Sequence, residues 1–131
     1  MAKLDITDLL GVRFKDHGRN LEEGFDCYGL AIEVSKRLGH ELKDVWYIKG
    51  NERTFTEKAE EVITEMSQNV IETDELELGN LVVFSDENGN MVHIGVMLND
   101  ERFIHCSKFG VNVQILREYY RNNWKVYKWR Q

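Results

Sequence analysis

The sequence predicts an α+β domain, in which N-terminal helices pack on a C-terminal antiparallel β-sheet of about five strands. Apolar residues recur at helical spacing in the first half of the chain, and beyond residue 80 they follow the two-residue period of strands. A chain of 131 residues can bury a core of its own. We therefore expect one domain over residues 1–131.

Two main helices are predicted. Apolar residues keep helical spacing from Cys27 to Leu38, and Gly39 follows as a stop signal. Thr54 and Glu57 have the form of a capping box, which opens a second helix from Phe55 to Asn69. Both helices precede the region of strand period, which is the order of an α+β domain.

Other segments before the sheet are shorter or irregular. A short helix is expected from Ile6 to Leu10, and an irregular polar loop from Val12 to Gly24. The stretch from Val45 to Ile48 favours a strand by composition, and the acidic stretch from Ile71 to Leu78 is interpreted as a solvated connector.

Five strands are predicted in the second half of the chain, with turns rich in Asn, Asp and Gly between them. They run from Leu81 to Phe84, Met91 to Leu98, Arg102 to Cys106, Val111 to Ile115, and Trp124 to Trp129.

Composition excludes several classes of function. The net charge of −6 argues against binding to a nucleic-acid backbone, and no apolar run is long enough to span a membrane. The first residues lack the pattern of a signal peptide, so we expect a protein that is cytoplasmic at synthesis. The two cysteines are then expected to be free thiols.

Cys27 is the first candidate for chemistry, because it lies where a loop ends and the first main helix begins. The N–H groups and dipole of a helix N-terminus favour a thiolate and are expected to lower the thiol pKa. Cys27 is thus a candidate nucleophile. The structural alternative is a buried cysteine that packs as a small apolar residue.

Two histidines lie in the strand-like segments, and the turn between the strands decides whether they meet. A two-residue turn, Asn99-Asp100, places His93 opposite Cys106. A three-residue turn pairs Leu98 with Arg102 and brings His93 and His105 to one face, diagonally and roughly 7–8 Å apart at the backbone.

The two registers imply different chemistry. If the histidines share a face with Cys27, His93 can act as the base on the thiol while His105 orients it. If Cys106 faces His93, a zinc site of His93, Cys106 and Cys27 is conceivable, although no closely spaced ligand pair is present. We expect no metal and no cofactor. His17 and His40 are interpreted as loop or helix-end residues.

Four segments together resemble the NlpC-type cell-wall cysteine peptidases, a papain-like family. They are Phe25-Asp26-Cys27-Tyr28-Gly29-Leu30, Leu78-Gly79-Asn80-Leu81-Val82-Val83-Phe84, Val92-His93-Ile94-Gly95-Val96 and Arg102-Phe103-Ile104-His105-Cys106. The resemblance extends from about Gly11 to Trp129. Tyr28 stands where many members have serine, and Asn80 where many have aspartate.

The resemblance implies a papain-like fold and hydrolysis of peptidoglycan stem peptides, typically at the γ-D-glutamyl–diamino acid bond. By this resemblance Cys27 would form an acyl-enzyme, His93 would be general base and then acid, and His105 would orient His93. Substrate contacts would come from Arg19, Asp26 and Tyr28, with Asp26 near the free amine of the stem peptide.

The entry segment, from Leu10 to Phe14 and then Gly18-Arg19, is similar in particular to the phage-tail branch of the family. This similarity implies a phage or prophage tail component that is associated with the virion and has tail proteins as partners. Two alternatives stay open: a non-catalytic tail-assembly protein that keeps the fold, and a related thiol acyltransferase or amidase.

Overall fold

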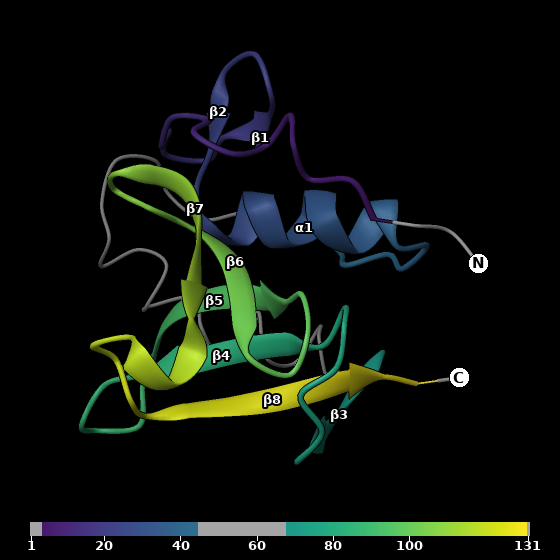
Figure 1. Cartoon of the computed structure of the whole chain (residues 1–131), viewed down its shortest axis with the longest axis vertical. Helices are drawn as coiled ribbons and strands as arrows, with labels where there is room; N and C mark the ends of the chain where they lie inside the picture. The colour runs from purple at the N-terminus through teal and green to yellow at the C-terminus, as the bar shows by residue number, and fades with distance from the viewer. Residues whose placement is uncertain (1–3, 45–67, 131) are drawn as a thin grey trace.

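A computed structural model of the protein describes residues 4–44 and 68–130. In this part of the chain one α-helix packs on a large antiparallel sheet (Figure 1). The elements are β1 (Arg19–Asn20), β2 (Gly24–Phe25), α1 (Cys27–Arg37), β3 (Val70–Thr73), β4 (Leu81–Ser85), β5 (Met91–Met97), β6 (Arg102–Ser107), β7 (Gly110–Ile115), the 3-10 turn η1 (Leu116–Glu118) and β8 (Trp124–Trp129).

The large sheet has the strand order β3-β8-β4-β5-β6-β7, and β1 and β2 form a separate two-stranded sheet. In Figure 1, α1 lies between the β1–β2 hairpin and the large sheet. The predicted helix at Cys27 and the five predicted strands are confirmed, and the fold is an α+β arrangement.

The sheet has a sixth strand among the described residues, because part of the expected acidic connector is β3. Val70 pairs with Trp129 and Thr73 with Val126, so β3 completes the edge of β8. Val70 is buried, whereas Ile71 and Glu72 are exposed. One apolar anchor and an available strand edge therefore outweigh the charge of the segment.

Two predictions for the N-terminal region are wrong. Residues 7–11 form turns rather than a helix, and the N–H of Gly11 bonds to the carbonyl of Val111 on β7 at 2.9 Å. The expected irregular loop contains β1 and β2, and the N–H of Phe25 bonds to the carbonyl of Arg13 at 3.1 Å. Long-range backbone hydrogen bonds, invisible to local patterns, order this segment.

Residues 45–67 lie outside the described part of the chain. They include the predicted strand from Val45 to Ile48 and all but the end of the predicted helix from Phe55 to Asn69. Residues 68 and 69 form a turn that leads into β3.

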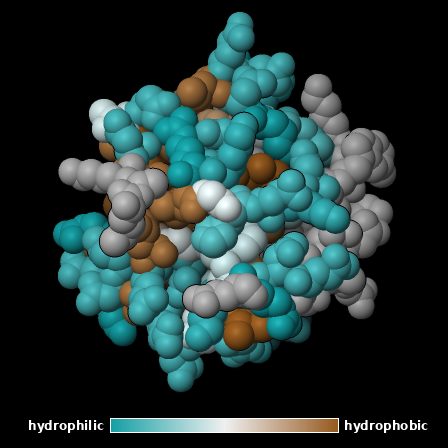
Figure 2. Space-filling model, turned by 90° about the vertical axis from the view of Figure 1, so that its right-hand side faces the viewer, coloured by the Kyte–Doolittle hydropathy of each residue, from teal (hydrophilic) through white to brown (hydrophobic). Residues whose placement is uncertain are grey.

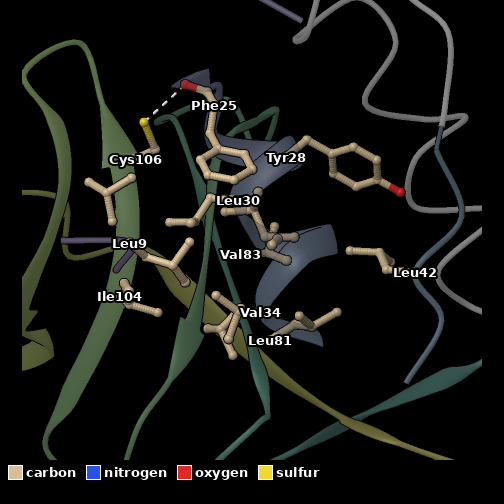
Figure 3. Packing of buried hydrophobic residues seen from close by; sticks show 14 of the residues in the cluster. Leu9, Phe25, Tyr28, Leu30, Val34, Leu42, Leu81, Val83, Ile104 and Cys106 are labelled. Atoms are coloured by element: carbon tan, nitrogen blue, oxygen red, sulfur yellow. Dashed lines mark hydrogen bonds between the residues drawn. The ribbon is translucent and has the colours of Figure 1, made fainter. Parts of the chain in front are cut away.

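Each face of the sheet has its own core. Leu30, Ala31 and Val34 of α1 pack on one face, against alternate residues of the strands (Figure 3). The strand residues of this face are Leu81, Val83, Ile94, Val96, Ile104 and Cys106. The opposite face carries Val82, Phe84, Met97, Phe103, Leu116, Tyr119 and Val126.

The molecular surface is mainly hydrophilic on the side seen in Figure 2, with smaller apolar areas between hydrophilic residues. Among the described residues no helix is both long and apolar enough to cross a membrane.

Candidate functional site

Cys27 is the first residue of α1, as predicted, and the preceding residue caps the helix. The Asp26 carboxylate accepts a hydrogen bond from the N–H of Gly29 at 2.7 Å. A Cβ atom on Gly29 would lie 2.0 Å from the carbonyl oxygen of Gly18, so only glycine allows this approach. The entry loop and the cap together fix the start of α1, and with it the position of the thiol.

The prediction of a lowered thiol pKa is wrong for this conformation. Cys27 is half-buried, and burial raises the pKa of its thiol, with the Asp26 carboxylate as the second cause. The backbone N–H groups of Ile94 and Tyr28 act in the opposite direction but are weaker. Desolvation thus outweighs the N–H groups at the helix start, and the thiol is neutral at rest.

The β5–β6 connection is a three-residue turn, which settles the register. Val96 pairs with Ile104, and the N–H of Leu98 bonds to the carbonyl of Arg102 at 2.9 Å. The Asn99 carboxamide oxygen closes the turn by accepting from the N–H groups of residues 101 and 102, at 2.8 and 2.7 Å. The connection is therefore an Asx-type turn.

This register brings the two histidines together on one face, as the three-residue alternative predicted. His93 Nε2 lies 2.7 Å from His105 Nδ1, with the ring planes at 82°. The side chains of Phe84, Phe103 and Tyr119 surround the pair, which is 7% and 1% exposed respectively.

Both imidazoles are neutral near neutral pH because of this environment. Burial lowers the pKa of His93 well below its ordinary value, and His105 and Arg121 add smaller effects in the same direction. Burial also lowers the pKa of His105, against opposing effects of Gln114 and Asn112. A neutral imidazole keeps the lone pair that a general base needs.

Gln114 is a polar neighbour of this pair that the sequence reasoning missed. Its Oε1 lies 2.5 Å from His105 Nε2, so a hydrogen-bonded chain runs from His93 through His105 to Gln114. The available signal was the strand period, since Asn112 and Gln114 alternate with Val111 and Val113 along β7.

The thiol and the imidazole pair are near neighbours along the strands, but no described hydrogen bond joins Cys27 to either ring. Cys27 packs with the core on the α1 face, whereas the rings contact the aromatic core of the opposite face. The sulfur lies against the backbone of Ile94, the residue after His93.

Strands β5 and β6 pair over only part of their length. The β5–β6 ladder consists of the pairs Val96–Ile104 and Met97–Phe103, whereas the β6–β7 ladder continues to Ser107–Gly110. In Figure 1, β6 turns away from β5 beyond the paired part. Helix α1 packs against both of these strands, β5 and β6, and each of them carries one histidine.

Gly95 allows the two strands to approach closely before they diverge. A Cβ atom here would lie 2.8 Å from Phe103 Cδ2 and 2.9 Å from the Ile104 carbonyl oxygen. The side chains of Phe103 and His105 and the backbone of Ile104 thus fill the space beside Gly95.

The three residues predicted to contact substrate form a connected structural unit. Arg19 Nη1 lies 2.8 Å from Asp26 Oδ1, and the guanidinium also pairs with the exposed carboxylate of Asp44. The Tyr28 ring is fully buried, and its hydroxyl donates to the carbonyl of Lys43. In this conformation Asp26 caps α1 and Tyr28 belongs to the core.

Cys106 lies on the α1 face of the sheet, not on the face of the histidine pair. Its Sγ donates to the Phe25 carbonyl at 3.1 Å on the α1 face (Figure 3). The His93 ring instead contacts Phe84 of the core on the opposite face. Residues 4–44 and 68–130 contain no cluster of three or more His, Cys, Asp or Glu side chains that could hold a metal. Both cysteines are free. The zinc alternative depends on the other register and fails with it.

The chain belongs to the NlpC/P60 family, whose family model matches residues 11–130. Members of this family are generally cell-wall peptidases and usually cysteine peptidases or amidases. A search of curated proteins found no match.

Among solved structures, the chain is similar to a protein described as similar to lipoprotein, of the NLP/P60 family, from Staphylococcus aureus. The TM-score is 0.57 at 20% identity, over 88% of this chain. The match spans 36% of the length of the staphylococcal protein, and it establishes a shared fold.

Proposed function

We propose that the protein is a cysteine peptidase that hydrolyses peptidoglycan stem peptides through an acyl-enzyme on Cys27. The observation that carries this proposal is the pair of neutral, hydrogen-bonded imidazoles beside the strand backbone that contacts the thiol. Family membership supports the substrate class. The γ-D-glutamyl–diamino acid bond is the specific bond we propose.

In the proposed reaction, the Cys27 side chain turns from the Ile94 backbone towards the adjacent His93. Because the thiol is neutral at rest and His93 is unprotonated, the base removes the thiol proton as the sulfur attacks the carbonyl carbon. The imidazolium then protonates the leaving amine, and water releases the acyl group from sulfur.

Charge that develops on the carbonyl oxygen requires hydrogen-bond donors. The backbone N–H groups at the start of α1 are suitable, because the first turn of a helix leaves its N–H groups without intrahelical partners. Asp26 satisfies the N–H of Gly29, so the N–H of Cys27 itself is the donor we propose.

The test uses purified full-length protein and muropeptides, with the products identified by mass spectrometry. We expect cleavage by the parent and its loss in Cys27→Ala and His93→Ala, while a Cys106→Ala control remains active. A folded, alkylatable parent that releases no peptide would refute the proposal and favour the non-catalytic alternative. Transfer of the acyl group to an added amine, without hydrolysis, would favour the acyltransferase.

We also propose that the enzyme is a phage or prophage tail component with tail proteins as partners. The resemblance of residues 10–19 to the phage-tail branch supports this role. Induction of the host prophage followed by mass spectrometry of purified tail particles tests it. Absence of the protein from intact particles would contradict a structural place in the tail.

A further inference from the structure

The imidazole pair and Gln114 form a chain of hydrogen bonds in which the donor and the acceptor of each bond are fixed. Gln114 presents Oε1, which only accepts, to Nε2 of His105 at 2.5 Å. Nε2 of His105 must therefore carry a proton. In a neutral ring Nδ1 of His105 is then unprotonated, and it accepts from Nε2–H of His93 across 2.7 Å.

These donor and acceptor roles also determine the protonation of Nδ1 of His93, the ring nitrogen that does not contact His105. Because its Nε2 holds the proton, Nδ1 keeps the lone pair. If the Gln114 amide were reversed, its NH₂ group would donate to His105, both rings would exchange tautomers, and Nδ1 of His93 would be protonated. The orientation of the Gln114 carboxamide thus decides whether Nδ1 of His93 has a free lone pair and can act as a base, or carries a proton and cannot.

Gln114 suits this role because the ring beside it is buried while Gln114 itself is exposed. Its amide is neutral, so it orients the pair without adding charge to an environment of aromatic rings. Asn112, opposite His105 on β7, also acts to raise the pKa of His105, but less than Gln114 does, and its Oδ1 atom has no partner among the described residues at hydrogen-bond distance and angle. Gln114 is accordingly the acceptor that the geometry assigns to His105.

We propose that Gln114 is a positioning residue, which fixes the tautomers of His105 and His93 so that Nδ1 of His93 is available as the base. The tautomer assignment depends on this structure alone. Its effect on catalysis rests on the proposed function.

Nitrogen NMR of the full-length protein, labelled at its histidine imidazoles, tests the tautomers without any substrate. We expect Nε2–H rings for both His93 and His105 in the parent near neutral pH, and loss of this single pattern in Gln114→Leu. An Nδ1–H ring in the parent would overturn the proposal, as would an unchanged pattern in Gln114→Leu. Sensitivity to Asn112→Ala alone would assign the role to Asn112 and also overturn it.

Gln114→Glu separates positioning from charge. Its carboxylate still accepts from His105 Nε2–H, so the tautomers should persist, but the added negative charge should raise the pH at which the pair becomes protonated. Among the residues that the structure describes, the other titratable groups facing the pair are Tyr119 and Arg121, which stay unchanged in all variants. A protonation pH that does not rise would contradict the direct contact.

Steady-state kinetics with muropeptides test whether Gln114 affects catalysis. We expect kcat of Gln114→Leu to fall by about tenfold to a hundredfold with little change in KM, and Gln114→Glu to recover activity at higher pH. An inactive parent would refute the proposed function and leave the NMR result to decide the tautomers. An active parent whose kcat is unaffected by Gln114→Leu would overturn the positioning role.

Discussion

Replacement of Asp26 tests how one carboxylate serves both the fold and the thiol. Asp26 Oδ1 accepts from the N–H of Gly29 at 2.7 Å and from Arg19 at 2.8 Å, and its side chain is 9% exposed. Asp26→Ala removes both bonds. Asp26→Asn keeps an oxygen that can cap the helix but removes the charge.

The expected losses of stability follow from these contacts. An N-cap bond contributes about 0.5–2 kcal/mol. The ion pair adds about 1 kcal/mol or less, because Arg19 is 23% exposed and keeps Asp44 as a partner. Asp26→Ala should therefore lower the free energy of unfolding by about 1–3 kcal/mol, and Asp26→Asn by about 1 kcal/mol or less.

The same substitutions should change the reactivity of the thiol in the opposite sense. The Asp26 charge raises the pKa of Cys27, so Asp26→Asn should lower that pKa and speed alkylation at a given pH. Iodoacetamide rates against pH, in a Cys106→Ala background that leaves a single thiol, measure this effect.

Urea unfolding measures stability, and Asp44→Asn is the matched control. It removes the charge of the exposed partner of Arg19 and should change the free energy of unfolding by about 0.5 kcal/mol or less. The reasoning is refuted if Asp26→Ala is as stable as the parent, or if the thiol pKa fails to drop in Asp26→Asn.

Three further predictions concern the sheet. Gly95→Ala should cost about 1–3 kcal/mol in urea unfolding, since its Cβ would meet β6, and parental stability would show that the strands can separate there. Ile104→Ala should cost about 2–5 kcal/mol because its side chain is fully buried, whereas Ile71→Ala, at 37% exposure, should cost less than about 1 kcal/mol. The lowered pKa values of His93 and His105 mean that the unfolded chain binds more protons. Stability should therefore be fully present above about pH 6.5 and decline as pH falls below it, an acid-side slope that a His93→Leu/His105→Leu variant should lose.

Local patterns in the sequence were sufficient for the helix that begins at Cys27 and for the two strands that carry His93 and His105. The helix start at Cys27 is marked by the Asp26 cap and by apolar residues at helical spacing, and the strands of the sheet are marked by their alternation. By contrast, β3 was missed because its pairing with β8 joins residues far apart in the chain.

The sequence pattern alone could not predict the geometry of the histidine pair. Two registers were compatible with the sequence, and the side chain of Asn99 selected one by closing a three-residue turn. The contact of Gln114 with His105 and the raised thiol pKa were also not predictable from local patterns. Both depend on what surrounds a group, and burial is a property of the packed chain.

The sequence by itself determined the α+β order of elements, the position of Cys27 at a helix start and the presence of two histidines in neighbouring strands. Periodicity and capping are local, so the residues themselves encode them. Only the tertiary structure decided that the two rings meet, that Gln114 completes their hydrogen-bonded chain and that the resting thiol is neutral. Those features arise from register and desolvation, which exist only once distant segments pack together.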